Sequence, residues 1–300
     1  MSARLAGAAL GAGLVVALAA CSGGGDAARD LLFVSTRDGD YAVFSMSAAG
    51  DDETRVTEEG GDPSSPQGLF FQIEPSVSPD GRTIAFASKR EGTFDIYVMS
   101  ADGTETRRLT STPHDDANPT WSADGARIAF ARGAGDIYVM NADGSGVRAV
   151  TQSSGQESEP AWSPDGGWIA FARRAAGTSI RELWLVRPDG SGLRQITSLS
   201  AVSTSPAWSP RGDRIAFSTD FRNTQFDIYS IGVDGTERQR VTTTAEDTFE
   251  PAWGPDGTIA FSERGSIYAV EDGNDEAREL TGAENDSDPA WWPVTEDGGD

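Results

Sequence analysis

The stretch EPAWSPDG at residues 159–166 recurs along the chain and decides the fold. Related copies read EPSVSPDG at 74–81, NPTWSADG at 118–125, SPAWSPRG at 205–212 and EPAWGPDG at 250–257, with a partial copy, DPAWWP, at 288–293. The first prolines of successive copies are spaced by 44, 41, 46, 45 and 38 residues. Periods of about 40–50 residues are typical of propeller blades and solenoid repeats.

Each copy continues with three more strand-like segments. Ile-Ala-Phe follows the turn, as at 169–171, and a segment such as Asp-Ile-Tyr-Val-Met at 95–99 comes next. An Asp-Gly turn then leads to a last short segment that ends in Thr. Pro sets the φ of a β-turn and Gly accepts its positive φ, so Pro-Asp-Gly joins strands tightly. Four short antiparallel strands per unit predict a propeller blade.

The two ends of the chain complement each other. The first copy begins at Leu31-Leu32-Phe33 and lacks the Pro-Ala-Trp strand, whereas the last copy, at 289–291, consists of that strand alone. Joined, they make one blade beside five whole ones. We therefore predict an all-β fold over residues 31–293, a six-bladed β-propeller of four-stranded antiparallel blades. The C-terminal strand pairs into the first blade and closes the ring, which removes the open edges of a linear array.

The first 21 residues have the pattern of an export signal. Arg4 precedes an apolar run of 16 residues, 5–20, which suits a signal peptide and is short for a membrane span. The run ends in Leu-Ala-Ala-Cys, which resembles a bacterial lipobox and implies lipidation of Cys21. Two acyl chains anchor a protein stably. Residues 22–30 are predicted to be a Gly-rich tether and residues 294–300 an acidic tail. We expect a lipid-anchored protein on the extracytoplasmic face of the cell membrane, in the periplasm or at the cell surface.

The repeated units PAWSPDG, IAF, DIYVM, ADG and RLT resemble the repeat of TolB-type propellers, a WD-repeat-like family. The resemblance covers about residues 31–293 and implies an extracytoplasmic binding protein. The resemblance also implies a competing class, the enzymes, because the same type of propeller occurs as a cap on some serine peptidases. Val77 and Arg211 depart from the repeat, at positions where the other copies have Trp and Asp, and we interpret both as drift.

Composition excludes several kinds of site. The formal net charge of −23 disfavours nucleic acid, and a single Cys and a single His exclude an internal disulfide and a His- or Cys-rich metal site. No G-x-S-x-G nucleophile elbow occurs, and His114 lies in a polar loop segment, so the chain is not expected to be an enzyme. The tryptophans of the repeat could stack on sugars, but their recurrence in one local context favours packing between blades.

The residue before each repeat proline forms the candidate ligand site, at the mouth of the channel. The series is Glu74, Asn118, Glu159, Ser205, Glu250 and Asp288. Carboxylates that face one channel repel each other unless they are neutralised. Ca²⁺ or Mg²⁺ would suit these oxygen ligands, as would a Lys or Arg side chain, and water contact at the rim is the third alternative. No cofactor is predicted, with calcium at the channel mouth the one exception kept open.

The sequence therefore predicts a monomeric, membrane-anchored binding or scaffold protein whose channel mouth binds a protein or peptide partner at the cell envelope. The membrane is contacted through the lipid anchor alone. The alternative function is a calcium-dependent six-bladed propeller hydrolase or lactonase, and a purely structural spacer is a third.

Overall fold

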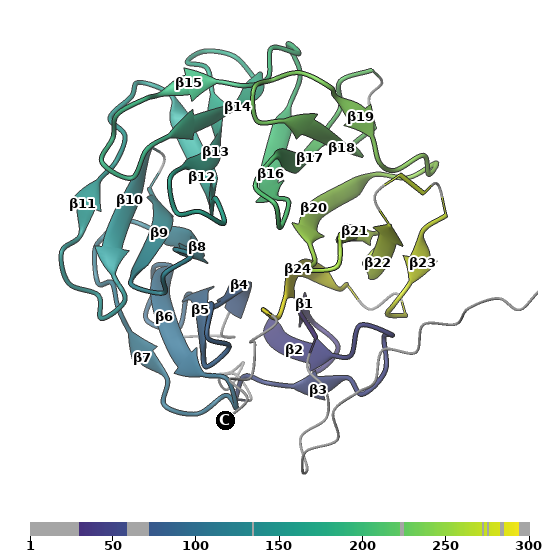
Figure 1. Cartoon of the computed structure of the whole chain (residues 1–300). Helices are drawn as coiled ribbons and strands as arrows, with labels where there is room; N and C mark the ends of the chain where they lie inside the picture. The colour runs from purple at the N-terminus through teal and green to yellow at the C-terminus, as the bar shows by residue number, and fades with distance from the viewer. Residues whose placement is uncertain are drawn as a thin grey trace, which may run out of the picture.

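A computed structural model describes residues 30–58, 72–133, 135–222, 225–271, 273–274, 276–282 and 285–293. The predicted signal peptide with Cys21, most of the predicted tether and the predicted acidic tail lie outside these ranges. Within the described residues the chain forms six four-stranded antiparallel sheets, arranged as blades around a central channel (Figure 1). No helix in this part of the chain has the length and apolar character needed to cross a membrane.

The blades follow one another along the chain, except that the first is built from both ends. Blade 1 comprises β24 (Ser287–Trp291), β1 (Leu31–Ser35), β2 (Ala42–Met46) and β3 (Thr54–Arg55). Blade 2 comprises β4 (Gln72–Val77), β5 (Thr83–Ser88), β6 (Asp95–Ser100) and β7 (Arg107–Arg108). Blade 3 comprises β8 (Asp116–Trp121), β9 (Arg127–Arg132), β10 (Asp136–Asn141) and β11 (Arg148–Ala149).

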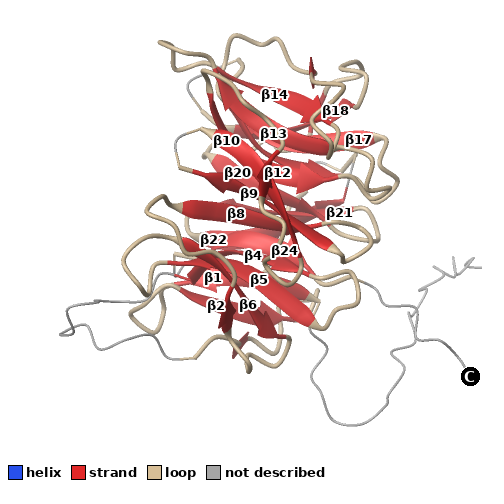
Figure 2. Cartoon of the chain, turned by 90° about the vertical axis from the view of Figure 1, so that its left-hand side faces the viewer, coloured by secondary structure: helices blue, strands red, loops and turns tan. Residues whose placement is uncertain are grey.

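Blade 4 comprises β12 (Gln156–Trp162), β13 (Ile169–Arg174), β14 (Arg181–Val186) and β15 (Arg194–Gln195). Blade 5 comprises β16 (Ser203–Trp208), β17 (Arg214–Thr219), β18 (Asp227–Gly232) and β19 (Gln239–Arg240). Blade 6 comprises β20 (Thr248–Trp253), β21 (Thr258–Glu263), β22 (Ser266–Glu271) and β23 (Arg278–Glu279). The sheets are stacked side by side around the axis when the molecule is seen from its side (Figure 2).

The ring closes as predicted. β24 pairs antiparallel with β1, with Leu31 opposite Trp291 and Leu32 opposite Ala290. The backbone N–H of Trp292 also donates to the carbonyl of Asp30 at 2.8 Å. The predicted fold class and blade count are confirmed.

The hydrophobic core lies between the blades. Six clusters of buried side chains each join two neighbouring blades, so together they run around the ring. The second strand of every blade carries one fully buried phenylalanine, in the series Phe33, Phe86, Phe130, Phe171, Phe217 and Phe261. The alternation of Ile and Phe with Ala produces this arrangement, because both faces of the strand are covered by a neighbouring blade.

The repeat tryptophans pack between blades, as their recurrence indicates. Trp162 lies in one cluster with Ala129 of blade 3, and Trp208 packs on the cluster that contains Ala170 of blade 4. The indole of Trp208 also donates to the carbonyl of Ala161 at 3.0 Å. Each such ring covers the preceding blade, which explains why the sequence repeats it.

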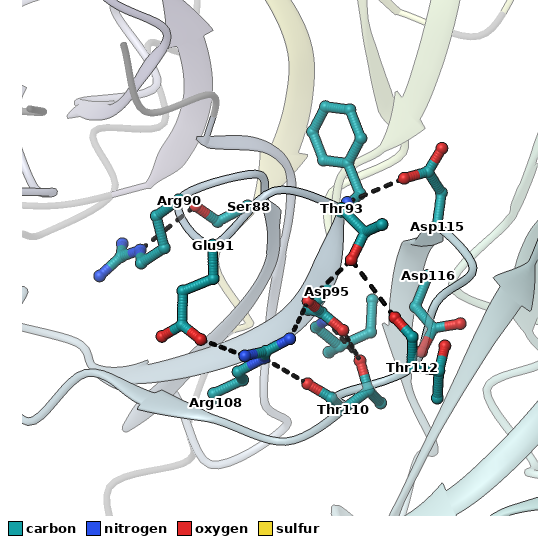
Figure 3. A network of polar contacts seen from close by, with 12 residues as sticks. Ser88, Arg90, Glu91, Thr93, Asp95, Arg108, Thr110, Thr112, Asp115 and Asp116 are labelled. Carbon is teal, nitrogen blue, oxygen red and sulfur yellow. Dashed lines mark hydrogen bonds and ion pairs between the residues drawn. The ribbon is translucent and has the colours of Figure 1, made fainter. Parts of the chain in front are cut away.

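The threonine that ends each unit fixes the outer edge of its blade. In blade 2 the backbone N–H of Ile96 donates to Thr110 Oγ1 at 2.9 Å. The Asp95 carboxylate accepts from Thr110 Oγ1 at 3.3 Å and from Arg108 Nη2 at 2.5 Å (Figure 3). The same bond from backbone N–H to threonine hydroxyl occurs in all six blades, at Thr57, Thr110, Thr151, Thr197, Thr242 and Thr281. The outer strands are only two residues long, so this bond continues the pairing beyond their ends.

Candidate functional site

The structure brings the six predicted site residues together. Each comes from the innermost strand of a different blade, and with the six prolines that follow them they line one cavity of about 160 Å³ on the channel axis. We call these residues the collar: Glu74, Asn118, Glu159, Ser205, Glu250 and Asp288. The collar lies inside the innermost strands, a few residues after each begins in five of the six blades, rather than in the loops before them.

A β-bulge places every collar side chain. The pairing of the innermost strand with its neighbour shifts register at this point in each blade, as between Ser158 and Ala161 or between Phe249 and Ala252. All six collar residues have φ between 49° and 57°, and none is glycine. Left-handed backbone costs a non-glycine residue about 1–2 kcal/mol, and proline disfavours helical backbone in the residue before it. The conformation therefore depends on contacts that hold it.

Those contacts join each blade to the next. The backbone N–H of Asn118 donates to Glu74 Oε2 at 2.5 Å, and the N–H of Glu159 donates to Asn118 Oδ1 at 3.3 Å. The N–H of Ser205 donates to Glu159 Oε2 at 2.6 Å. On the far side of the ring, the N–H of Asp288 donates to Glu250 Oε2 at 2.9 Å. Each of these side chains thus satisfies the backbone of the following blade.

The series of side-chain hydrogen bonds around the collar is interrupted at Ser205. Its hydroxymethyl group is shorter than the side chains of Glu and Asn, and no corresponding bond joins Ser205 to the backbone of Glu250 among the contacts of the described residues. Glu250 Oε2 accepts a second hydrogen bond, from Ser262 Oγ at 3.0 Å. The series therefore includes one joint that lacks the side-chain bond.

Burial and the charges of neighbouring carboxylates raise the pKa of three collar carboxyls. Burial raises the pKa of Glu74 to about 7; the charges of Glu159 and Glu250 also raise it, while hydrogen bonds from Asn118 lower it. The pKa of Glu159 is raised by burial, against hydrogen bonding from Ser205 and the charge of Arg181. Burial, followed by the charges of Glu250 and Glu74, raises the pKa of Asp288 well above its usual range. The site therefore favours a proton or a ligand cation.

Two residues contribute to this site that the sequence did not reveal. Arg181 Nη1 lies 3.9 Å from Glu159 Oε1, and Ser262 binds Glu250 as described above. They come from β14 and β21, the third strand of blade 4 and the second strand of blade 6, whose register relative to the channel has no signature in the repeat. The cation of Arg181 makes the collar less acidic on the side of blade 4.

The other sequence candidates lie apart from the collar. His114 is exposed in the loop before β8. In the portion of the chain that the structure describes, no three His, Cys, Asp or Glu side chains are grouped so that they could hold a metal ion.

Comparison with known proteins identifies the family to which the repeat belongs. Residues 67–181 and 148–296 match the family model described as TolB beta propeller domain. Tol-Pal system protein TolB of Anaeromyxobacter dehalogenans (strain 2CP-C) is 52% identical over 44 residues, which are 15% of this chain and 10% of that protein. Uncharacterized peptidase YuxL of Bacillus subtilis (strain 168) is 44% identical over 73 residues, which are 24% of this chain and 11% of that protein. The chain thus spans about a tenth of the length of these curated relatives.

A solved structure shows the same fold. TolB from Acinetobacter baumannii superposes with a TM-score of 0.74 at 19% sequence identity, over 90% of this chain and 68% of that one. The two matches to the family model run from residue 67 to residue 296 and cover more than half of the 300 residues. With five complete repeats and a sixth made from the two ends, the chain belongs to the TolB β-propeller domain family.

Proposed function

We propose that this protein is an extracytoplasmic scaffold at the cell envelope that binds a basic segment of a protein or peptide partner at its collar. One observation supports this above others: six blades place four carboxylates around one cavity, where burial raises the pKa of Glu74, Glu159 and Asp288. An ammonium or guanidinium group offsets that repulsion. The net charge of −23 attracts such a partner from a distance.

Binding is favoured over catalysis. The collar offers charge and hydrogen bonds held by a rigid ring. Some relatives carry peptidase names, yet the matched segments are about a tenth of YuxL and of Dipeptidyl-peptidase 5 of Porphyromonas gingivalis. The sequence contains no G-x-S-x-G motif.

The collar can be tested with a defined basic probe, trilysine, titrated calorimetrically into the full chain. The double variant Glu159→Gln with Glu250→Gln keeps an oxygen acceptor for each blade joint but removes two charges. We expect it to bind about tenfold more weakly, the equivalent of about 1.4 kcal/mol, and to be as stable as the wild type or more so.

A matched control is available on the periphery. Glu105 and Glu237 are also left-handed glutamates, with φ of 55° and 52°, but they are exposed on the outer loops. The double variant Glu105→Gln with Glu237→Gln removes the same charge and should bind trilysine like the wild type. Equal binding by both double variants, or destabilisation of the collar variant with normal binding, would show that the collar is only architectural.

Anchoring is the second part of the proposal and rests on Cys21. Cys21→Ser removes the thiol that lipidation needs, so we expect the protein to leave the membrane fraction or to remain unprocessed. Fractionation and the intact mass of the mature protein measure this. A variant that stays in the membranes with the wild-type mass would contradict the anchor and leave the collar proposal intact.

A further inference from the structure

A second cavity lies between blades 5 and 6, at the turns that end their innermost strands. Its volume is about 520 Å³, and its lining includes Arg211, Arg214, Trp253, Asp256 and Glu271. The cavity beside the corresponding turn of blade 4, between blades 4 and 5, measures about 200 Å³. We call the larger one the blade 5–6 pocket. It shares no lining residue with the collar.

The sequence departs from the repeat at this pocket. The turn of blade 6 has Gly254 where blades 2 to 5 have Ser, and it is one residue shorter than theirs. Arg211 stands where the other turns have Asp; it is exposed and makes no ion pair with any described residue. Pro255, Asp256, Gly257 and Thr258 of the shorter turn line the pocket together with Arg211, which adds a positive charge where the other turns have a negative one.

The tryptophan of blade 6 also differs in its hydrogen bond. The indoles of Trp121, Trp208 and Trp291 donate to a backbone carbonyl of the preceding blade. The indole of Trp253 donates instead to Gly257 O, in its own turn, at 3.2 Å. The ring of Trp253 lines the pocket.

At the interface between blades 3 and 4, an arginine of this chain occupies the position that corresponds to the blade 5–6 pocket. The guanidinium of Arg127, at the start of β9, lies over the ring of Trp162 with its carbon 4.9 Å from the ring centre. Arg127 Nη2 is also 3.8 Å from the carboxylate of Asp124. A cation over an aromatic face is attracted by the ring quadrupole. The blade 3–4 interface therefore holds an arginine between a tryptophan and an aspartate.

The corresponding arginine of blade 5 is directed away from its tryptophan. Arg214 occupies the register of Arg127, but its Nη2 donates to Ser230 Oγ at 2.7 Å and to Glu237 O at 3.0 Å. The equivalents of Ser230 in blades 2, 3, 4 and 6 are Val98, Val139, Leu185 and Ala269, which offer no acceptor. No guanidinium of the described residues is recorded over the ring of Trp253.

We propose that the blade 5–6 pocket binds an arginine side chain of a partner polypeptide, in the place that Arg127 fills between blades 3 and 4. The guanidinium stacks on Trp253, and the carboxylates of Asp256 and Glu271 supply the negative charge. Arg211 then pairs with an acidic residue beside the arginine of the partner.

The test uses the tripeptide acetyl-Gly-Arg-Glu-amide as probe, titrated into the full chain with the collar charges removed by Glu159→Gln and Glu250→Gln. That background separates this pocket from the collar. Ser230→Val removes the acceptor that diverts Arg214, so Arg214 should cover Trp253 and weaken probe binding at least about tenfold. Glu271→Gln, at an exposed residue, should weaken binding about threefold without a change in stability.

Ser45→Val is the matched control. Ser45 holds the register of Ser230 in blade 1 and is equally buried, and its hydroxyl lies 3.4 Å from Thr54 O. The Ser45→Val variant should bind the probe with the same affinity as its parent, the chain that carries only Glu159→Gln and Glu250→Gln. The proposal is overturned if the parent protein does not bind the probe. It is also overturned if the Ser230→Val and Ser45→Val variants bind the probe equally and Glu271→Gln leaves binding unchanged. Binding of the neutral sugar maltose that is lost in Ser230→Val, without binding of the probe, would reassign the pocket to saccharides.

Discussion

At the scale of single residues, the collar shows how one side chain serves both architecture and electrostatics. Glu74 holds a left-handed bulge because its carboxylate accepts from the N–H of Asn118, and the same carboxylate repels its neighbours across the channel. A proton relieves the repulsion and leaves an oxygen for the joint. The protonation of Glu74 is therefore coupled to the stability of the ring.

This coupling has a defined sign. Burial raises the pKa of Glu74 from 4.5 to about 7, so between these values the folded chain holds a proton that the unfolded chain has released. The group favours folding at low pH, and that contribution is lost as the pH rises through 7. Glu74→Gln mimics the protonated form, so near pH 8 we expect it to be about 3 kcal/mol more stable than the wild type, and near pH 5 more stable by less than about 1 kcal/mol.

Denaturant unfolding at the two pH values measures the difference. Glu105→Gln is the control, because Glu105 is left-handed as well but exposed. The prediction is wrong if Glu74→Gln shows the same offset from wild type near both pH values, because the carboxyl would then contribute no proton linkage.

At the scale of the element, β24 is only five residues long but has several roles. It is the innermost strand of blade 1, it supplies Asp288 to the collar, and Trp291 packs on the cluster between blades 6 and 1. Without it, β1 loses its pairing partner, and the fully buried Leu31, Leu32 and Phe33 lose cover. The strand closes the ring and completes the core at once.

Deleting residues 288–300 should therefore lower the melting temperature and cause aggregation, since an unpaired β1 is an open edge beside apolar surface. Thermal melting and light scattering measure both effects. Deletion of residues 294–300 alone keeps β24 and is the control that should melt like the wild type. An unchanged melting temperature in the longer deletion would mean that β24 does not hold the ring closed.

At the scale of the whole molecule, the sequence predicted the repeated strands and their packing, and missed the backbone conformation of the collar and the features that occur once. The blade count, the composite first blade and the packing of the tryptophans follow from the recurrence of Pro-Ala-Trp and Ile-Ala-Phe. The placing of Glu74 and its equivalents around one cavity follows from their common register. The left-handed bulges could not be inferred, because proline normally disfavours helical backbone before it.

The blade 5–6 pocket escaped prediction for a related reason. Arg211 stands out as a departure from the repeat, but a single departure does not distinguish drift from a site. The decisive contact is between Arg214 and Ser230, which lie diagonally across the adjacent strands β17 and β18 although 16 residues separate them in the sequence. Such a contact becomes visible only once the strands are in register.

The pairing of β1 with β24 also constrains when the protein can fold. Residues 31 and 291 lie near opposite ends of the 300-residue chain, so this contact has nearly the longest loop-closure entropy available to the sequence. During synthesis the first blade is made first and completed last, after the ribosome has added the final strand. A chain that stops before β24 would therefore lack the innermost strand of blade 1, and that blade stays incompletely folded until β24 has emerged from the ribosome.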